Sequence, residues 1–132
     1  KKGFYTKLRP SKEEKKEIIK GTLTLKKINS YNHIQGLIIR DNKVISKETR
    51  KGTKKMIKSI PKSKIKKGIL IKLPKAKQDL RVDLPTIGID TFKDCNMAGI
   101  KGIVIKSNQN IIINKEVCIE YANQNKLFLV VI

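Results

Sequence analysis

The sequence contains no tryptophan, and aromatic residues make up only 5% of its 132 residues. Proteins that grip single-stranded nucleic acid usually stack bases on aromatic side chains, so a stacking surface is not expected. Histidine occurs once, and the two cysteines, Cys95 and Cys118, lack the paired spacing of a zinc site. No apolar run approaches the roughly 20 residues of a membrane-spanning helix, and no signal-peptide pattern opens the chain. We therefore expect one domain in the reducing cytoplasm, with both cysteines as buried free thiols.

Acidic residues are scarce in the first part of the chain. The formal net charge is +20, and residues 1–77 hold 25 basic and 5 acidic groups, whereas residues 78–132 hold 6 of each. The whole excess therefore lies upstream of residue 78. Lysine outnumbers arginine 27 to 4, whereas nucleic-acid surfaces favour arginine for bidentate contacts. The charge leaves three kinds of partner open, namely anionic lipid head groups, a nucleotide and nucleic acid.

Helix and strand patterns alternate along the chain with short links. Helices are predicted over residues 11–29, 53–60, 90–98 and 114–125, and strands over residues 34–40, 43–47, 68–73 and 127–131. Residues 102–106 and 110–113 are predicted to pair as a β-hairpin. Ser11 and Glu14 match a capping box, and Asp90 and Asn114 are expected to cap the last two helices. This order predicts an α/β fold, a single domain with a mixed sheet flanked by helices.

One segment, residues 78–83, combines acidic and basic side chains more densely than any other. In an extended chain alternate residues share a face, so Asp79, Arg81 and Asp83 would lie about 6.5–7 Å apart on one side. Carboxylates bind divalent cations and a guanidinium binds phosphate oxygens, so this pattern suits a phosphate and a metal ion held together. An edge strand with a surface salt bridge explains the same alternation.

A longer spaced pattern surrounds this segment. It comprises Gly68-Ile-Leu-Ile-Lys72, Lys75, Gln78-Asp79, Arg81, Asp83, Pro85, Ile87-Gly88, Thr91, Ala98-Gly99-Ile100, Gly102-Ile103 and a terminal strand containing Phe128. On these residues the chain resembles the C-terminal domain of the LpxI-type UDP-2,3-diacylglucosamine pyrophosphatases of lipid A biosynthesis. The similarity covers nearly the whole chain. It implies that residues 1–132 form the family's C-terminal, catalytic domain and that its separate N-terminal domain is absent.

The resemblance also implies an activity and a site. Family members hydrolyse the pyrophosphate bond of UDP-2,3-diacylglucosamine to UMP and 2,3-diacylglucosamine 1-phosphate in Gram-negative bacteria, and they need Mg²⁺. Asp79 and Asp83 would be the catalytic residues and the metal ligands, and which of them acts as the base stays open. The implied substrate-binding residues are Lys72, Lys75, Gln78, Arg81 and Thr91. The implied partners are the UDP-linked glycolipid, the missing N-terminal domain and the surface of the inner membrane.

Two upstream motifs differ from the family pattern. The family's Asp-Ile-Gly-Gln appears as His33-Ile34-Gln35-Gly36, and its Glu-Gly-Thr-Asp appears as Lys51-Gly52-Thr53-Lys54, whereas Glu48 is retained. Replacing an acid with lysine reverses the local charge and can eject a cation. These changes motivate a second hypothesis, a degenerate or truncated relative that keeps the fold and ligand binding without turnover. A basic nucleic-acid-binding module is a third.

The segment Gly52-Thr53 has two interpretations of its own. It matches a phosphate-binding turn before a helix, and capping of that helix by Thr53 explains it equally well. His33, which stands where the family has an acid, is interpreted as a surface or structural residue.

Overall fold

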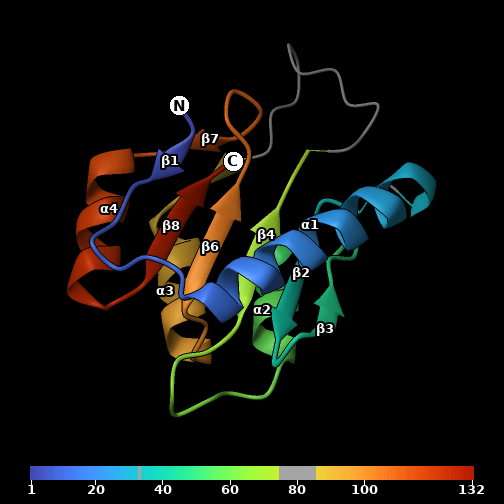
Figure 1. The fold of residues 1–132 in the computed structure, drawn as a ribbon, viewed down its shortest axis with the longest axis horizontal. Coiled ribbons are helices and arrows are strands. Elements are labelled where there is room, and N and C mark those ends of the chain that lie inside the picture. Colours follow the sequence, from blue (N-terminus) through green and yellow to red (C-terminus); the bar gives the residue numbers. More distant parts are fainter. Residues whose placement is uncertain (33, 75–85) are drawn as a thin grey trace.

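A mixed six-stranded sheet forms the centre of the molecule (Figure 1). The structure is a computed structural model that describes residues 1–32, 34–74 and 86–132, without the side chains of residues 29–32. Its strand order is β1-β8-β6-β4-β2-β3, and β4, β6 and β8 run parallel while the other neighbours are antiparallel. The strands are β1 (Gly3–Phe4), β2 (Gly36–Arg40), β3 (Lys43–Lys47), β4 (Ile69–Lys72), β6 (Gly102–Ile105) and β8 (Phe128–Val131). The predicted fold class, a single α/β domain with a mixed sheet, is confirmed.

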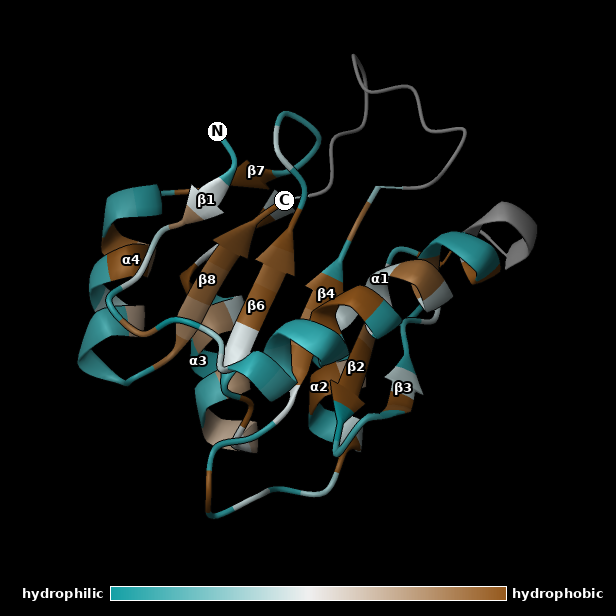
Figure 2. Ribbon diagram, viewed as in Figure 1, coloured by the Kyte–Doolittle hydropathy of each residue, from teal (hydrophilic) through white to brown (hydrophobic). Residues whose placement is uncertain are grey.

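Helices cover both faces of this sheet. Helix α1 (Lys12–Asn32) lies in front of it in Figure 1, and α2 (Thr53–Ser59), α3 (Ile89–Ala98) and α4 (Lys115–Gln124) lie behind it. Every residue of β2, β4, β6 and β8 is buried, and these strands are rich in Ile, Leu and Val, as in sheets covered on two sides (Figure 2). Within the described ranges, no helix is both long enough and apolar enough to cross a lipid bilayer.

Helix α1 begins at the predicted capping box. The Ser11 N–H donates to Glu14 Oε1 at 2.8 Å, and the Glu14 N–H donates to Ser11 Oγ at 3.1 Å. Further along, Gly21 lets the helix approach the sheet, because a Cβ there would lie 2.3 Å from the Ile71 side chain. A residue that weakens an isolated helix is therefore needed where this helix packs on β4.

The first hairpin and both cysteines match the sequence predictions. Strands β2 and β3 pair in antiparallel fashion, and Asp41 and Asn42 between them have φ values of 51° and 62°, as a tight hairpin turn requires. Cys95 and Cys118 are buried free thiols. Burial raises the pKa of both thiols, and the nearby Asp94 carboxylate adds to the effect at Cys95, so neither is a reactive thiolate.

The predicted second hairpin is wrong. Strand β6 pairs with β4 and β8 in the main sheet, whereas β7 (Ile111–Ile112) pairs in parallel with β5 (Thr86–Ile87) in a separate two-stranded sheet. The apolar runs were located correctly, but their partners are distant in sequence and local patterns do not encode them.

Of the two predicted helix caps, the one at Asp90 is wrong, whereas Asn114 is confirmed as the N-cap residue of α4. Asp90 lies inside α3, whose N-cap is Gly88, and Asn114 occupies the N-cap of α4 in a left-handed conformation without a side-chain cap bond. The end of α3 is conventional, since Gly99 adopts φ 78° and satisfies backbone carbonyls there.

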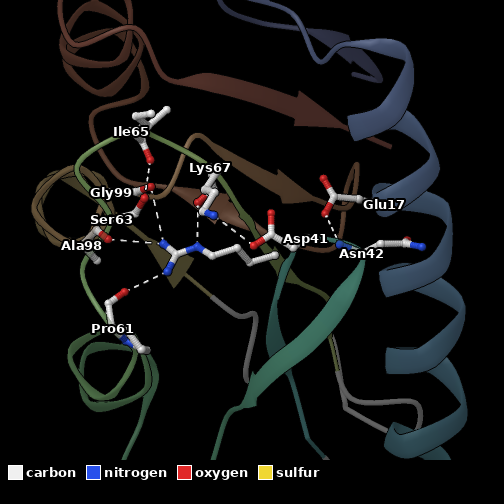
Figure 3. A network of polar contacts seen from close by, with 10 residues as sticks. Glu17, Asp41, Asn42, Pro61, Ser63, Ile65, Lys67, Ala98 and Gly99 are labelled. Atoms are coloured by element: carbon white, nitrogen blue, oxygen red, sulfur yellow. Dashed lines mark hydrogen bonds and ion pairs between the residues drawn. The ribbon is translucent and has the colours of Figure 1, made fainter.

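A buried arginine, Arg40, links several backbone segments at the end of the sheet where β2 ends (Figure 3). Arg40 Nε donates to the Lys67 carbonyl at 3.0 Å, and Nη1 donates to the Pro61 carbonyl at 2.8 Å. Its Nη2 donates to the carbonyls of Ala98 at 3.3 Å and Gly99 at 3.5 Å. One side chain therefore fixes the loop before β4 to the end of α3.

Candidate functional site

Lys72, one of the two predicted site residues that the structure describes, lies at the end of the sheet opposite Arg40. Strand β4 ends there at Lys72, β2 begins there at Gly36, and the register pairs these two residues. Strand β3 runs back to the same end of the sheet, and Glu48 follows it directly. The Glu48 N–H donates to the Gly36 carbonyl at 2.8 Å. Ligands of open α/β sheets bind outside the carboxyl ends of parallel strands, which is where Lys72 lies.

Lys72, Glu48 and Thr53 form a closed triangle of polar contacts. The Lys72 ammonium lies 3.2 Å from Glu48 Oε1 and also donates to the Thr53 hydroxyl. That hydroxyl in turn donates its own proton to Glu48 Oε1. The directions are mutually consistent, because an ammonium can only donate and a carboxylate can only accept. We call these three residues the Lys72 triangle.

The triangle is nearly closed to solvent. The side chains of Lys72 and Glu48 are 10% and 9% exposed. A buried charge is tolerated only when it is paired and hydrogen-bonded, and each charge here neutralises the other. Glu48 is therefore engaged by both an ammonium and a hydroxyl, an arrangement that positions Lys72 and leaves the carboxylate poorly suited to act as a base.

Capping of α2 by Thr53 is contradicted by this geometry. The N-cap of α2 is Gly52, which makes no side-chain cap bond, and the Thr53 hydroxyl contacts Glu48 and Lys72 instead. Gly52 adopts φ 94°, a conformation that glycine tolerates and that lets the chain turn from Glu48 into the helix. Lys51 and Lys54, which replace the two acids of the family pattern, have exposed side chains.

The remaining described candidate, Thr91, belongs to the first turn of α3. Helix α3 follows β5. The crossover from β4 through α3 to the parallel strand β6 places the start of α3 at the same end of the sheet as Lys72. Thr91 is partly buried, and its N–H donates to the Gly88 carbonyl at 3.1 Å. The hydrogen bonds of the Lys72 triangle do not include it.

The other predicted site residues lie outside the described residues. They are Lys75, Gln78, Asp79, Arg81 and Asp83, together with His33 of the upstream motif. Among the residues that are described, no three His, Cys, Asp or Glu side chains come close enough to hold a metal ion. The chain enters residues 75–85 directly after Leu73 and Pro74, so the Lys72 triangle holds the strand end from which that segment departs.

The triangle as a unit is not apparent in the sequence, although each of its residues stands out there. The resemblance implies that Lys72 binds substrate and assigns no role to Glu48, and Thr53 is interpreted as a helix cap or as part of a phosphate-binding turn. One signal was available, since Lys72 ends a run of apolar strand residues and a lysine there needs a buried acid. Which acid it meets depends on the β2–β3 hairpin bringing Glu48 alongside.

Comparison with known proteins identifies the family of this chain. The profile of the LpxI C-terminal domain matches residues 1–130. The chain belongs to the LpxI C-terminal domain family. UDP-2,3-diacylglucosamine pyrophosphatase LpxI of Caulobacter vibrioides is 29% identical over 135 residues, an alignment that covers 96% of this chain and 48% of that protein. The chain therefore spans about half the length of this LpxI relative, and the resemblance inferred from the spaced motif is confirmed.

Proposed function

We propose that this chain carries the catalytic part of an Mg²⁺-dependent hydrolase that acts on UDP-2,3-diacylglucosamine in lipid A biosynthesis. The products would be UMP and 2,3-diacylglucosamine 1-phosphate, released at the cytoplasmic side of the membrane. The observation that carries the proposal is the family match over residues 1–130, and the Caulobacter vibrioides relative is named for this substrate.

Asp79 and Asp83 are the proposed catalytic residues. Hydrolysis forms a bond from a water oxygen to one phosphorus and breaks the bridging P–O bond, so a base must take a proton from the water. A carboxylate can accept that proton, and the other product leaves as a phosphate anion. Arg81 lies between the two acids in the sequence and would bind non-bridging oxygens through its guanidinium fork.

Further proposed contacts to the substrate come from flanking residues. Lys75 and Gln78 precede Asp79 and Asp83 in the sequence, and Thr91 lies at the start of α3, at the same end of the sheet as Lys72. Lys72 would donate its remaining N–H to the diphosphate while Glu48 and Thr53 hold its ammonium in one orientation.

The described residues do not by themselves form a magnesium site. Glu48 is already neutralised by Lys72, and among the described residues no three His, Cys, Asp or Glu side chains come close enough to hold a metal ion. Mg²⁺ prefers carboxylate oxygens and keeps several waters, so the proposed ligands are Asp79 and Asp83. When bound, the ion would neutralise charge on the diphosphate. Binding of Mn²⁺ followed by electron paramagnetic resonance tests this independently of turnover, and Asp79→Asn or Asp83→Asn should weaken it at least tenfold.

The test of the activity uses the protein encoded by the complete reading frame, with detergent-dispersed UDP-2,3-diacylglucosamine and Mg²⁺. We expect UMP release, measured by mass spectrometry, and a loss of at least a hundredfold with Asp79→Asn or Asp83→Asn. Glu120→Gln is the matched control, since Glu120 is an exposed acid in the middle of α4. No UMP release by the unmodified protein would reject the hydrolase.

The exposed lysines at the start of α2 favour one second candidate, a non-catalytic relative that retains ligand binding. Lys51 and Lys54 place two positive charges where the family pattern has acids, at the same end of the sheet as the Lys72 triangle. If this candidate is right, Lys51→Glu combined with Lys54→Asp should raise Mn²⁺ affinity or create turnover. Unchanged affinity and turnover would reject it.

A further inference from the structure

The outer face of α1 has an unusual composition for a helix that packs on a sheet. Its inner face is buried, with Ile18 and Leu25 in the core beside the buried polar residues Glu14 and Thr22. Over residues 12–28 the exposed side chains are two aliphatic residues, one acid and six lysines, namely Ile19, Leu23, Glu13, Lys12, Lys15, Lys16, Lys20, Lys26 and Lys27. The helix therefore combines positive charge with aliphatic groups toward solvent.

The two exposed aliphatic residues lie together. Ile19 and Leu23 are four residues apart, which places them on neighbouring turns of one side of the helix, and they are 62% and 63% exposed. Lysines at positions 16, 20, 26 and 27 flank them along and around the helix. Figure 1 shows α1 at the front of the molecule, and no other element covers it in that view. We call this set of exposed residues the α1 face.

The helices on the other side of the sheet do not repeat this pattern. The exposed residues of α4 include the acids Glu116 and Glu120 beside Val117, and those of α3 are Asp90, Lys93 and Met97. Net charge alone would predict a basic surface on any face of this lysine-rich protein. Paired exposed aliphatic residues framed by lysines are specific to the α1 face among these three helices.

We propose that the α1 face docks on an anionic lipid surface. Lysines attract acidic head groups, and their aliphatic stems let the ammonium groups reach the head groups while Ile19 and Leu23 enter the boundary with the acyl chains. Helix α1 also leads directly into β2, whose first residue, Gly36, pairs with Lys72. A docked molecule would thus hold its candidate site close to the membrane.

The proposal rests on the proposed function in one respect, since a diacylated substrate resides in a membrane. The binding itself does not require hydrolysis. Vesicle binding without substrate therefore tests the docking surface, and hydrolysis of detergent-dispersed substrate tests the activity, so failure of one is distinguishable from failure of the other.

The experiment is co-sedimentation of the full chain with vesicles made of equal parts phosphatidylcholine and phosphatidylglycerol. Ile19→Ser combined with Leu23→Ser should weaken binding about tenfold, because affinity at an interface scales with the apolar area buried. The matched control is Ile65→Ser combined with Val117→Ser, which removes two aliphatic residues that are 79% and 53% exposed elsewhere. This control should bind within twofold of the unmodified chain, and both double variants keep the same net charge.

Circular dichroism and thermal unfolding establish that both double variants are folded. Equal binding by the two double variants, or no binding of the unmodified chain to anionic vesicles, would overturn the proposal. Binding that is just as tight to phosphatidylcholine alone would do so as well, because the lysines would then contribute nothing. If sedimentation velocity instead shows a dimer that Ile19→Ser with Leu23→Ser dissociates, the face belongs to a second copy of the chain and lipid docking is rejected.

Discussion

Two cations are buried at opposite ends of the same sheet, and they are held in different ways. Lys72 pairs with a carboxylate, Glu48, at 3.2 Å. Arg40 is surrounded by the carbonyl oxygens of a loop and a helix end. Burial lowers the pKa of the Arg40 guanidinium, and the neighbouring Asp41 carboxylate partly offsets the effect. At one end an ammonium is hydrogen-bonded to a carboxylate, and at the other a guanidinium is hydrogen-bonded to backbone carbonyls.

The difference matches what each end does in the fold. Arginine carries five N–H donors in a fixed fork, so it can join several backbone segments at once. Lysine is a compact charge on a flexible stem, so it needs partners that fix its direction, and Glu48 and Thr53 supply them. The Arg40 end is a structural clamp on loop backbone. The Lys72 end holds an oriented ammonium at the strand end after which the sequence continues toward Asp79 and Asp83.

The largest effect is expected from Arg40→Met. The substitution leaves the carbonyls of Pro61, Lys67 and Ala98 without this donor, and we expect the free energy of unfolding to fall by about 4 kcal/mol. Urea denaturation measures it. The matched control Arg50→Met, at an exposed position, should change stability by less than about 0.5 kcal/mol. A loss below about 1 kcal/mol for Arg40→Met would mean that the clamp is not structural.

Lys72→Met should be the next most costly change. It leaves the Glu48 carboxylate buried with the Thr53 hydroxyl but without its countercharge, and breaking a buried pair in this way costs about 3 kcal/mol. Lys55→Met, at an exposed position of α2, is the matched control.

A double variant sharpens this second prediction. Glu48→Gln combined with Lys72→Met removes both charges, so its stability should exceed that of Lys72→Met alone by about 1–2 kcal/mol. Neutralising a single acid should not restore the stability lost in Arg40→Met, because backbone carbonyls hold the Arg40 guanidinium. Rescue of Arg40→Met by Asp41→Asn would show that the two ends are alike after all.

Thr53→Val should have a moderate effect at the Lys72 end. It removes a hydroxyl that both accepts from Lys72 and donates to Glu48, and we expect a loss of about 1–2 kcal/mol in urea denaturation. The control is Thr49→Val, whose hydroxyl accepts one exposed bond from the Lys51 N–H at 3.2 Å. Equal effects of the two substitutions would mean that Thr53 does not orient the buried pair.

Asp41→Asn should have the smallest effect. The Lys67–Asp41 pair is slightly shorter than the buried one, at 3.0 Å against 3.2 Å, but its side chains are 48% and 67% exposed. Water and salt screen such a pair, so its loss should cost about 0.5 kcal/mol and less at high salt. Unfolding in low and high sodium chloride measures this, and a cost equal to that of Lys72→Met would contradict the role assigned to burial.

Much of the fold could be predicted because its signals are local. The capping box at Ser11 and Glu14, the Asp41–Asn42 turn and the buried apolar strands all depend on residues near one another in the chain. The pairing of β7 with β5 could not be predicted, because a short apolar strand can pair with any strand of matching length and its own sequence does not say which. The Asp90 cap failed because the chain enters α3 through Gly88 instead.

For the candidate site, the sequence by itself determined which residue types are present and that they follow the family pattern from Gly68 to Thr91. Only the tertiary structure decided that Lys72 faces Glu48 and Thr53. Glu48 and Thr53 lie 24 and 19 positions before Lys72 in the sequence. The β2–β3 hairpin and the turn into α2 bring them to the same end of the sheet as Lys72. The physical reason is burial, because a lysine that ends a core strand is stable only where the fold supplies an acid.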